Sequence, residues 1–525
     1  MSEKIIIGSR GSDLALWQAE FVRGELKRIG LEAEIRIIKT KGDLVQLSWD
    51  KIEGKGFFTK EIEDALLNRE IDLAVHSHKD LPTDAPPRLV IAAVSQREDP
   101  RELLLINKNA VDERMRFSLK ANAVTGTSSA RRKSQLLAWR PDLKLSDLRG
   151  NVPTRIQKLR DKEYDAILIA YAGVSRLGID LSGFHAELLD AQEFIPAPAQ
   201  GVLALQVREN DSRLIDKLKA ITNREVEGAI AVERRVMNLF QGGCQLPLGV
   251  LCEQEENEEG EKRFTVRVAK AEKWDSLPRY FYFESKRAEG LAEKIVERIR
   301  SSAPATVFIT RDEKKNDLFK RCLEGNGYTV FCRSLIEVRP VPMRNYRKCD
   351  WVFFSSRNAV KYFFEQNPDV EGVRFGAVGK STAEELRRYG KRAEFIGSSD
   401  DTRMTGKKFS ALVGNKTVLF PQAKVSMKTI QLQLPRKENV IDLVVYETVK
   451  NPVGNELPVN DCGILVFTSP SNVETFFEKF KVQGQKIIAM GDATANALAR
   501  KGVKANKQPV SFDDLGLLQA VFSIS

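Results

Sequence analysis

EIDLAVHSHKDLP, residues 70–82, decides the fold class of this chain. It contains a short, mostly apolar run, Ile71–Val75, which is typical of a strand buried inside an α/β sheet. A polar turn that carries Asp80 follows this run directly. Ligands of open α/β sheets bind beyond the carboxyl ends of the strands, so the turn is a candidate site.

The same alternation of apolar runs and helical patterns extends along the N-terminal part of the chain. EIDLAV (70–75) resembles EYDAIL (163–168), and the Gly/Ser turns at 8–12 and 126–130 each precede a helical pattern. These internal similarities predict two α/β lobes whose turns open toward a common cleft. The predicted strands are Lys4–Gly8, Glu34–Ile38, Asp72–Val75, Ala123–Thr125 and Ala166–Ala170, and the predicted helices are Leu14–Ile29, Thr59–Asn68, Ala130–Ala138 and Val226–Phe240.

Length and composition indicate a globular protein of several domains. The chain has 525 residues, 42% hydrophobic and 30% charged. It has no apolar run near the ~18 residues that span a membrane and no signal peptide at its start. Six widely spaced cysteines without a CxxC pair favour a reducing cytoplasm over disulfides or a zinc site. SSAPA (301–305) precedes a new apolar strand, Thr306–Thr310, and predicts the main domain boundary.

The last third contains an internal repeat. VFFSSRNAVKYFF (352–364) resembles VFTSPSNVETFF (466–477), and GAVGKSTAEEL (376–386) resembles IAMGDATANAL (488–498). Each copy has the pattern strand, turn, helix, strand, turn, helix, which predicts two related α/β lobes. The four helix N-termini would offer free backbone N–H groups to a carboxylate-rich ligand, although plain capping explains any single turn equally well.

The positive charge of the chain does not indicate a nucleic-acid partner. The net charge is +11, but the basic residues are spread along the chain among acidic ones, and no nucleic-acid-binding motif is present. Several arginines near one cleft instead predict a substrate with several carboxylates, because a guanidinium grips a carboxylate bidentately. Surface salt bridges suffice for Arg140 and Arg160, but less so for the adjacent Arg131 and Arg132 beside a Gly/Ser turn. The candidate cations are Arg10, Lys55, Lys60, Arg131, Arg132, Arg149, Arg155 and Arg176.

Two further residues are candidates for chemistry. Asp80 can stabilise a developing cation or handle a leaving amine, although a structural turn aspartate before Pro82 explains it equally well. Cys244 lies in GGCQLPLG, an open loop that could expose a nucleophile or an attachment point. His76 and His78 lack a third ligand nearby, so no metal site is predicted.

The motifs of residues 1 to roughly 300 resemble those of porphobilinogen deaminase. They occur in that family's order, from SRGSDLALWQ, KGFFTKE and VHSHKDLP through GTSSARRKSQL and YDAILIAYAGVSRLG to PAPAQGVLALQVRE and GGCQLPLG. His78 departs from the pattern, since relatives often carry methionine there. The resemblance implies a covalent dipyrromethane cofactor on a thioether to Cys244, with Asp80 as the catalytic carboxylate. It implies cofactor binding by Lys79, Asp80, Thr127, Ser129, Arg131, Arg132, Arg155 and Gly173, and substrate binding by Arg10, Ser12, Gln18, Lys55, Lys60, Arg149, Arg155 and Arg176.

Residues 305–525 resemble uroporphyrinogen-III synthase. VFITR, SSRNAV, VLFPQA, VVYETV, FTSPSNV and AMGDATANAL occur in that family's order. Tyr446 matches the family tyrosine of the V-Y-x-T motif and is the candidate catalytic residue, because a phenol can donate a hydrogen bond to the departing hydroxyl of the substrate. The resemblance implies substrate binding by Ser355, Gly379, Ser469, Ser471, Gly491 and Thr494.

Together the two resemblances imply a bifunctional enzyme of tetrapyrrole biosynthesis. Four porphobilinogens would lose ammonia and form hydroxymethylbilane, which would then close, with inversion of its last ring, to uroporphyrinogen III. The implied fold is α/β and multidomain: two periplasmic-binding-protein-like lobes and a small α+β domain, then a two-lobed synthase. A cytoplasmic monomer is expected, with no nucleic-acid or membrane partner. The expected domains are 1–98 with 197–215, 103–195, 218–302, 305–340 with 447–525, and 344–442.

Two alternatives remain open from the sequence. A two-lobed anion-binding protein without chemistry would explain the lobes and the arginines, but not Asp80 and Cys244 in family register. An active deaminase could instead carry an inactive or regulatory synthase-like part.

Overall fold

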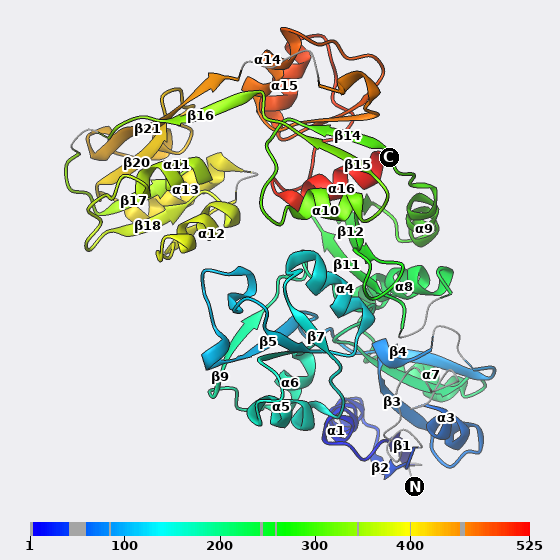
Figure 1. Cartoon of the computed structure of the whole chain (residues 1–525). Helices are drawn as coiled ribbons and strands as arrows, with labels where there is room; N and C mark the ends of the chain where they lie inside the picture. The colour runs from blue at the N-terminus through cyan, green and yellow to red at the C-terminus, as the bar shows by residue number, and fades with distance from the viewer. Residues whose placement is uncertain are drawn as a thin grey trace. The chain divides into compact units, whose positions relative to one another are not determined.

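The computed structural model divides the chain into two compact units, 1–302 without 113–115, and 303–525 with 113–115 (Figure 1). Each unit is an α/β structure, so the predicted fold class is confirmed. Among the described residues, no helix has the length and the apolar character needed to cross a membrane. The structure describes residues 4–40, 59–82, 86–241, 245–257, 260–343, 346–398, 401–451 and 457–525.

The first unit begins with a five-stranded sheet in the order β2-β1-β3-β10-β4. β1 is parallel to β2 and β3, whereas β10 is antiparallel to both β3 and β4. The helices contribute apolar side chains such as Val22 and Leu26 to the core under this sheet, where they join Ile7 and Leu73. The elements are β1 (Ile5–Ser9), α1 (Asp13–Arg28), β2 (Ala33–Ile37), α3 (Lys60–Leu67), β3 (Leu73–Ser77), β4 (Leu89–Val94), β10 (Leu203–Arg208) and α7 (Ser212–Leu218).

A second five-stranded sheet has the order β7-β6-β8-β5-β9. β5 follows β4 in the chain but pairs antiparallel with β8 and β9, so the chain crosses from the first sheet to the second and later returns as β10. At the crossing, Glu98 N donates to the Gly201 carbonyl over 3.1 Å. Gly201 has φ 89°, and a Cβ there would lie 2.2 Å from the Glu98 carbonyl oxygen. The elements are β5 (Glu102–Asn107), β6 (Val124–Gly126), α4 (Ala130–Trp139), β7 (Lys144–Ser146), α5 (Val152–Arg160), β8 (Ala166–Ala170), α6 (Tyr171–Leu177) and β9 (Phe184–Leu188).

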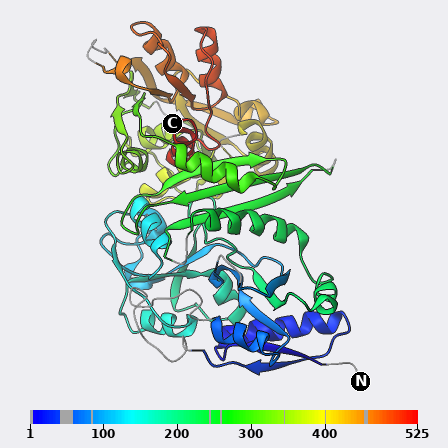
Figure 2. The same cartoon turned by 90° about the vertical axis from the view of Figure 1, so that its right-hand side faces the viewer.

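The first unit ends in a three-stranded antiparallel sheet, β11-β12-β13, covered by two helices (Figure 2). α8 packs on β11 and on α9 through buried side chains that include Ile230, Val232 and Val236. The elements are α8 (Arg224–Leu239), β11 (Leu248–Glu256), β12 (Lys262–Lys270), β13 (Arg279–Ser285) and α9 (Leu291–Ser301).

The second unit contains two sheets. The sheet β15-β14-β22-β23 is entirely parallel. The other, β16-β21-β20-β17-β18-β19, is parallel except for the pair β16 and β21, whose antiparallel ladder runs from Ile336 opposite Lys450 to Pro340 opposite Tyr446. The strands are β14 (Thr306–Ile309), β15 (Thr329–Cys332), β16 (Ile336–Pro340), β17 (Trp351–Phe354), β18 (Arg374–Ala377), β19 (Phe395–Ile396), β20 (Val418–Ala423), β21 (Val440–Lys450), β22 (Ile464–Phe467) and β23 (Lys486–Ala489).

The predicted internal repeat is confirmed in the second unit. Its first block forms β17–α11 in one copy and β22–α14 in the other, and its second block forms β18–α12 and β23–α15. Ser356 and Ser469 cap α11 and α14, because their side chains accept from the backbone N–H groups of Ala359 and Asn472. The helices are α10 (Leu318–Glu324), α11 (Arg357–Phe364), α12 (Lys380–Arg388), α13 (Thr402–Val413), α14 (Pro470–Phe477), α15 (Asp492–Arg500) and α16 (Asp514–Ile524).

Candidate functional site

Asp80 lies on a single 3-10 turn, His78–Asp80, at the carboxyl end of β3. The turn is fixed by backbone bonds, from His78 N to the Val202 carbonyl (2.9 Å) and from Leu81 N to the His78 carbonyl (3.3 Å). Asp80 itself is exposed. The carboxylate therefore stands at the sheet edge where α/β folds bind ligands, on a backbone that is held in place.

The two histidines of this segment are buried and neutral. Burial lowers the pKa of His76 to about 4, although a hydrogen bond with Gln206 (3.1 Å) partly offsets it. Burial lowers the pKa of His78 to about 3, with smaller contributions from the positive charges of Arg234 and His76. Among the described residues, no cluster of three or more side chains could hold a metal ion.

His78→Met should reduce the acid sensitivity of this sheet. The folded pKa of His78 lies below its ordinary value of 6.5, so the unfolded chain binds the proton first and stability falls as pH drops below about 6.5. Between pH 7.5 and 5.5 we expect the variant to lose about 1.4 kcal/mol less unfolding free energy than wild type. Hydrogen exchange of the β3 amides at both pH values measures this difference. The half-exposed His185→Gln is the control, and an equal loss in wild type and His78→Met would contradict the prediction.

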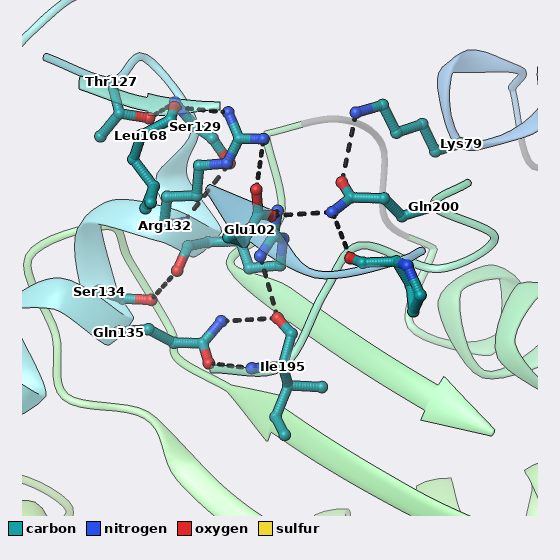
Figure 3. A network of polar contacts seen from close by, with 12 residues as sticks. Lys79, Glu102, Thr127, Ser129, Arg132, Ser134, Gln135, Leu168, Ile195 and Gln200 are labelled. Atoms are coloured by element: carbon teal, nitrogen blue, oxygen red, sulfur yellow. Dashed lines mark hydrogen bonds and ion pairs between the residues drawn. The ribbon is translucent and has the colours of Figure 1, made fainter. Parts of the chain in front are cut away.

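Glu102, the first residue of β5, is the centre of a buried ion cluster (Figure 3). It is fully buried and accepts from Arg131 Nη2 (2.5 Å) and Arg132 Nη2 (2.7 Å). Burial alone would raise the pKa of Glu102, but the two arginines outweigh it and lower this pKa to about 2. Glu102 is therefore ionised throughout the physiological range and neutralises part of the arginine pair.

The cluster extends to the neighbour of Asp80. Gln200 Nε2 donates to Glu102 Oε1 over 3.1 Å, and Lys79 Nζ donates to Gln200 Oε1 over 3.2 Å (Figure 3). Burial lowers the pKa of Lys79, and the negative charge of Asp80 opposes this effect. A continuous polar chain thus joins the arginine pair of one sheet to the Asp80 turn of the other.

Arg131 and Arg132 are largely occupied within the protein. Arg131 Nη1 donates to the Ile195 carbonyl (2.9 Å) and Arg132 Nη1 to the Leu168 carbonyl (3.1 Å). Arg132 Nε, by contrast, is buried and has no hydrogen-bond partner among the described residues. The pair therefore supplies positive charge, but its Nη groups are bonded within the protein, whereas the buried Arg132 Nε has no partner in the described part of the chain.

Arg155 lies close to both Asp80 and Arg132. Burial lowers its pKa to about 10, Arg132 adds to this effect, and Asp80 opposes it. Its Nε donates to the carbonyl of Gly150, the residue before the N-cap of α5, over 2.7 Å.

Other predicted residues of this unit lie at turns, at helix starts or in helix packing. Thr127 Oγ1 accepts from Ser129 N, and Ser129 caps α4 by accepting from Arg132 N, both over 3.4 Å. Gly173 lies in α6 where an added Cβ would be 3.3 Å from Val152 and 3.7 Å from Leu14, so a small residue suits close packing with α1. Arg10 and Arg149 are half-buried, Ser12 precedes α1, Lys60 begins α3, and Lys55 and Cys244 lie outside the described residues.

Arg176 and Gln18 bind other parts of the protein. Arg176 Nη2 donates to the Gly201 carbonyl (2.6 Å), and its guanidinium lies 5.7 Å from the centre of the Trp17 ring. Gln18 is buried and donates to Ser77 Oγ over 2.9 Å. Arg176 therefore links α6 to the crossing segment and to α1, whereas Gln18 links α1 to β3.

In the second unit, Tyr446 on β21 forms a small hydroxyl cluster. Its hydroxyl lies 3.2 Å from Ser356 Oγ, and its ring lies 5.8 Å from that of Tyr362. Burial raises the pKa of Tyr446, so the phenol keeps its proton and can donate a hydrogen bond. The predicted site residue is Ser355, but its neighbour Ser356 makes this contact; the sequence signal for Ser356 is its N-cap position before α11.

The remaining predicted residues of this unit all lie at helix starts. Gly379 and Gly491 precede α12 and α15, and Ser471 lies in the first turn of α14. Gly491 has φ 86°, and a Cβ there would approach the Phe512 ring to 2.9 Å. The Thr494 hydroxyl is buried and donates to the Met490 carbonyl over 3.1 Å.

Comparison with known proteins assigns both units. Residues 5–216 match the family model "Porphobilinogen deaminase, dipyromethane cofactor binding domain". The porphobilinogen deaminase of Nitratiruptor sp. is 44% identical over 255 residues, which are 48% of this chain and 80% of that protein. That of Syntrophomonas wolfei is 46% identical over 250 residues, 47% of this chain and 80% of that protein. The chain belongs to the porphobilinogen deaminase family.

The second unit adds a synthase to this deaminase. Residues 316–519 match the family model "Uroporphyrinogen-III synthase HemD". The uroporphyrinogen-III synthetase structure from Helicobacter pylori is 19% identical, covering 41% of this chain and 97% of that one, with a TM-score of 0.32. An arginine-specific periplasmic binding protein from Salmonella typhimurium is 11% identical, covering 44% and 94%, with a TM-score of 0.26.

The family matches confirm the two predicted activities, that of a deaminase and that of a synthase. The chain is a bifunctional enzyme of tetrapyrrole biosynthesis, with a porphobilinogen deaminase followed by a uroporphyrinogen-III synthase. Its cofactor is dipyrromethane, and its substrates are pyrrole polycarboxylates. The alternative of an anion-binding protein without chemistry is wrong. The individual residue roles and domain limits remain predictions.

Proposed function

We propose that the first unit builds hydroxymethylbilane from four porphobilinogens with Asp80 as the catalytic carboxylate, and that the second closes it to uroporphyrinogen III. The observation that carries the first part is the exposed Asp80 at the end of β3, within electrostatic reach of Arg155 and Lys79. An anion there, surrounded by cations on elements of both sheets, suits a substrate that carries carboxylates and develops a positive charge when it reacts.

The donor set near Asp80 fits the dipyrromethane cofactor. Each of its two rings carries two carboxylates. Arg155, Lys79 and the Nε of Arg132, which has no partner among the described residues, are cationic donors for such groups. When bound, the cofactor supplies the pyrrole carbon to which the first substrate is added. A thioether to Cys244 follows the family pattern, and that residue lies outside the described ones.

The residues of the chain then act on each substrate in turn. The cations bind its acetate and propionate groups and orient the ring toward Asp80. Loss of ammonia leaves an electron-poor azafulvene, and the Asp80 carboxylate stabilises its positive charge at the pyrrole N–H. Four additions followed by hydrolysis release hydroxymethylbilane.

In the second unit, Tyr446 is the proposed donor to the departing hydroxyl of hydroxymethylbilane. The phenol keeps its proton because burial raises its pKa, and the hydroxyl of Ser356 lies within hydrogen-bonding distance to orient it. The substrate must be held so that its last ring attacks through its substituted carbon. The capped helix starts of α11 and α14, with their backbone N–H groups, suit the carboxylates of such a chain.

Tyr446→Phe should give a mixture of type I and type III products from porphobilinogen. The variant keeps the ring but loses the phenol O–H, so assisted closure slows and spontaneous closure of free hydroxymethylbilane competes. Product isomers are separated by chromatography after oxidation. Tyr362→Phe, which removes a hydroxyl bonded to the Val338 carbonyl, is the control and should give type III alone. Pure type III from Tyr446→Phe would reject the assignment.

A further inference from the structure

Arg234 binds the backbone on both sides of Asp80. This residue of α8 donates through Nη1 to the carbonyls of His78 (3.4 Å) and Leu81 (2.9 Å), and through Nη2 to the carbonyl of Pro82. The three acceptors lie two residues before Asp80 and one and two residues after it. One planar guanidinium thus brackets the turn that carries the candidate catalytic carboxylate.

The helix that presents Arg234 is itself firmly anchored. The adjacent Glu233 is fully buried and accepts from Arg97 Nη1 (2.7 Å) and Cys252 N (2.7 Å) through Oε1. Its Oε2 accepts from Ala199 N (2.6 Å) and from Arg97 Nη2 (3.3 Å). These bonds fix α8 to both crossing segments and to β11. The backbone that carries the Arg234 guanidinium is therefore held in place.

The contacts around the Arg234 guanidinium indicate that it positions the Asp80 turn and is not simply a surface charge. His78 is buried and neutral, and the positive charge of Arg234 contributes to lowering its pKa. α8 ends at Leu239, five residues before Cys244 in the sequence. One helix therefore contacts the Asp80 turn near its middle and leads at its end into the segment proposed to hold the cofactor.

We infer that Arg234 is a positioning residue for Asp80: it holds the catalytic turn at a fixed place relative to the helix that leads to the cofactor cysteine. The inference rests on the proposed role of Asp80. Arg234 does not touch the reacting atoms. Its contribution is orientation, which matters because a displacement of about 1 Å at a reacting group can cost on the order of 100-fold in rate.

The test compares three variants of the full chain, with rates expressed per cofactor-loaded enzyme as counted by intact mass. Arg234→Met should load the cofactor and consume porphobilinogen with a kcat lower by about 10- to 100-fold and a KM within about threefold of wild type. Arg234→Lys restores one donor of the fork and should recover part of the loss. Arg235→Met is the matched control, since Arg235 is half-exposed on the same helix and bonds Glu293 and Asn238; it should keep the wild-type kcat.

The outcomes separate this inference from the proposed function. A kcat of Arg234→Met within about twofold of wild type, while Asp80→Asn is inactive, overturns the role of Arg234 alone. An active Asp80→Asn overturns the catalytic assignment itself. If Arg234→Met does not fold or load, Arg234→Lys decides: a lowered kcat at wild-type KM supports positioning, and a wild-type kcat overturns it.

Discussion

Cys244→Ala should abolish deaminase turnover and leave the purified chain lighter by one dipyrromethane. Attachment of the cofactor requires a thiolate, and the five described cysteines disfavour one. Burial raises the pKa of Cys322 to about 12 and those of Cys332, Cys349 and Cys462 to about 11, and it raises that of Cys252 as well. Cys244, in its glycine-rich loop, is then the remaining attachment point.

Intact mass of the wild type and of Cys244→Ala measures the cofactor directly. Cys332→Ala is the control, because Cys332 is a half-buried thiol of the second unit, and it should keep both the mass increment and the activity. A Cys244→Ala protein that still carries the increment would refute the attachment site.

Asp80→Asn should lower the rate of porphobilinogen consumption at least ~10²-fold, the usual cost of removing a key charge-stabilising group. The substitution keeps the shape of the side chain, and the turn is held by backbone bonds and by Arg234, so the variant should fold and carry cofactor. Single-turnover kinetics on loaded enzyme isolate the chemical step. Asp216→Asn, an exposed aspartate paired with Lys219, is the control. Near-normal turnover by Asp80→Asn would reject its catalytic role.

Local sequence patterns predicted the elements that frame the sites. The predicted strand Ala166–Ala170 is β8, and the predicted helix Ala130–Ala138 is α4 with one residue added. The repeat predicted both strand–turn–helix pairs of the second unit, because apolar periodicity and capping serines are local signals. The order and the antiparallel pairing of β5 and β10 within the two N-terminal sheets were not predicted, since strand order depends on distant pairing.

The polar interior was harder to predict than the elements. Glu102 is a single acid at the start of an otherwise apolar strand, and nothing local shows that it binds Arg131 and Arg132. Arg140, for which a surface salt bridge was expected, is buried and donates to the carbonyls of Arg116, Leu119 and Lys120 as well as to Asp142. Apart from Asp142, which is two residues from Arg140, these partners are brought together only by the tertiary fold, so sequence spacing alone could not reveal them.

The most direct test of the central claim is the isomer formed when the purified full-length chain receives porphobilinogen as its only substrate. Two working active sites in one chain predict uroporphyrinogen III, because the synthase must close hydroxymethylbilane before it closes unaided to the type I ring. Porphobilinogen consumption, measured in the same reaction, shows that the deaminase is active. Type I alone, at full deaminase activity, would contradict the account and make the second unit an inactive or regulatory synthase-like part.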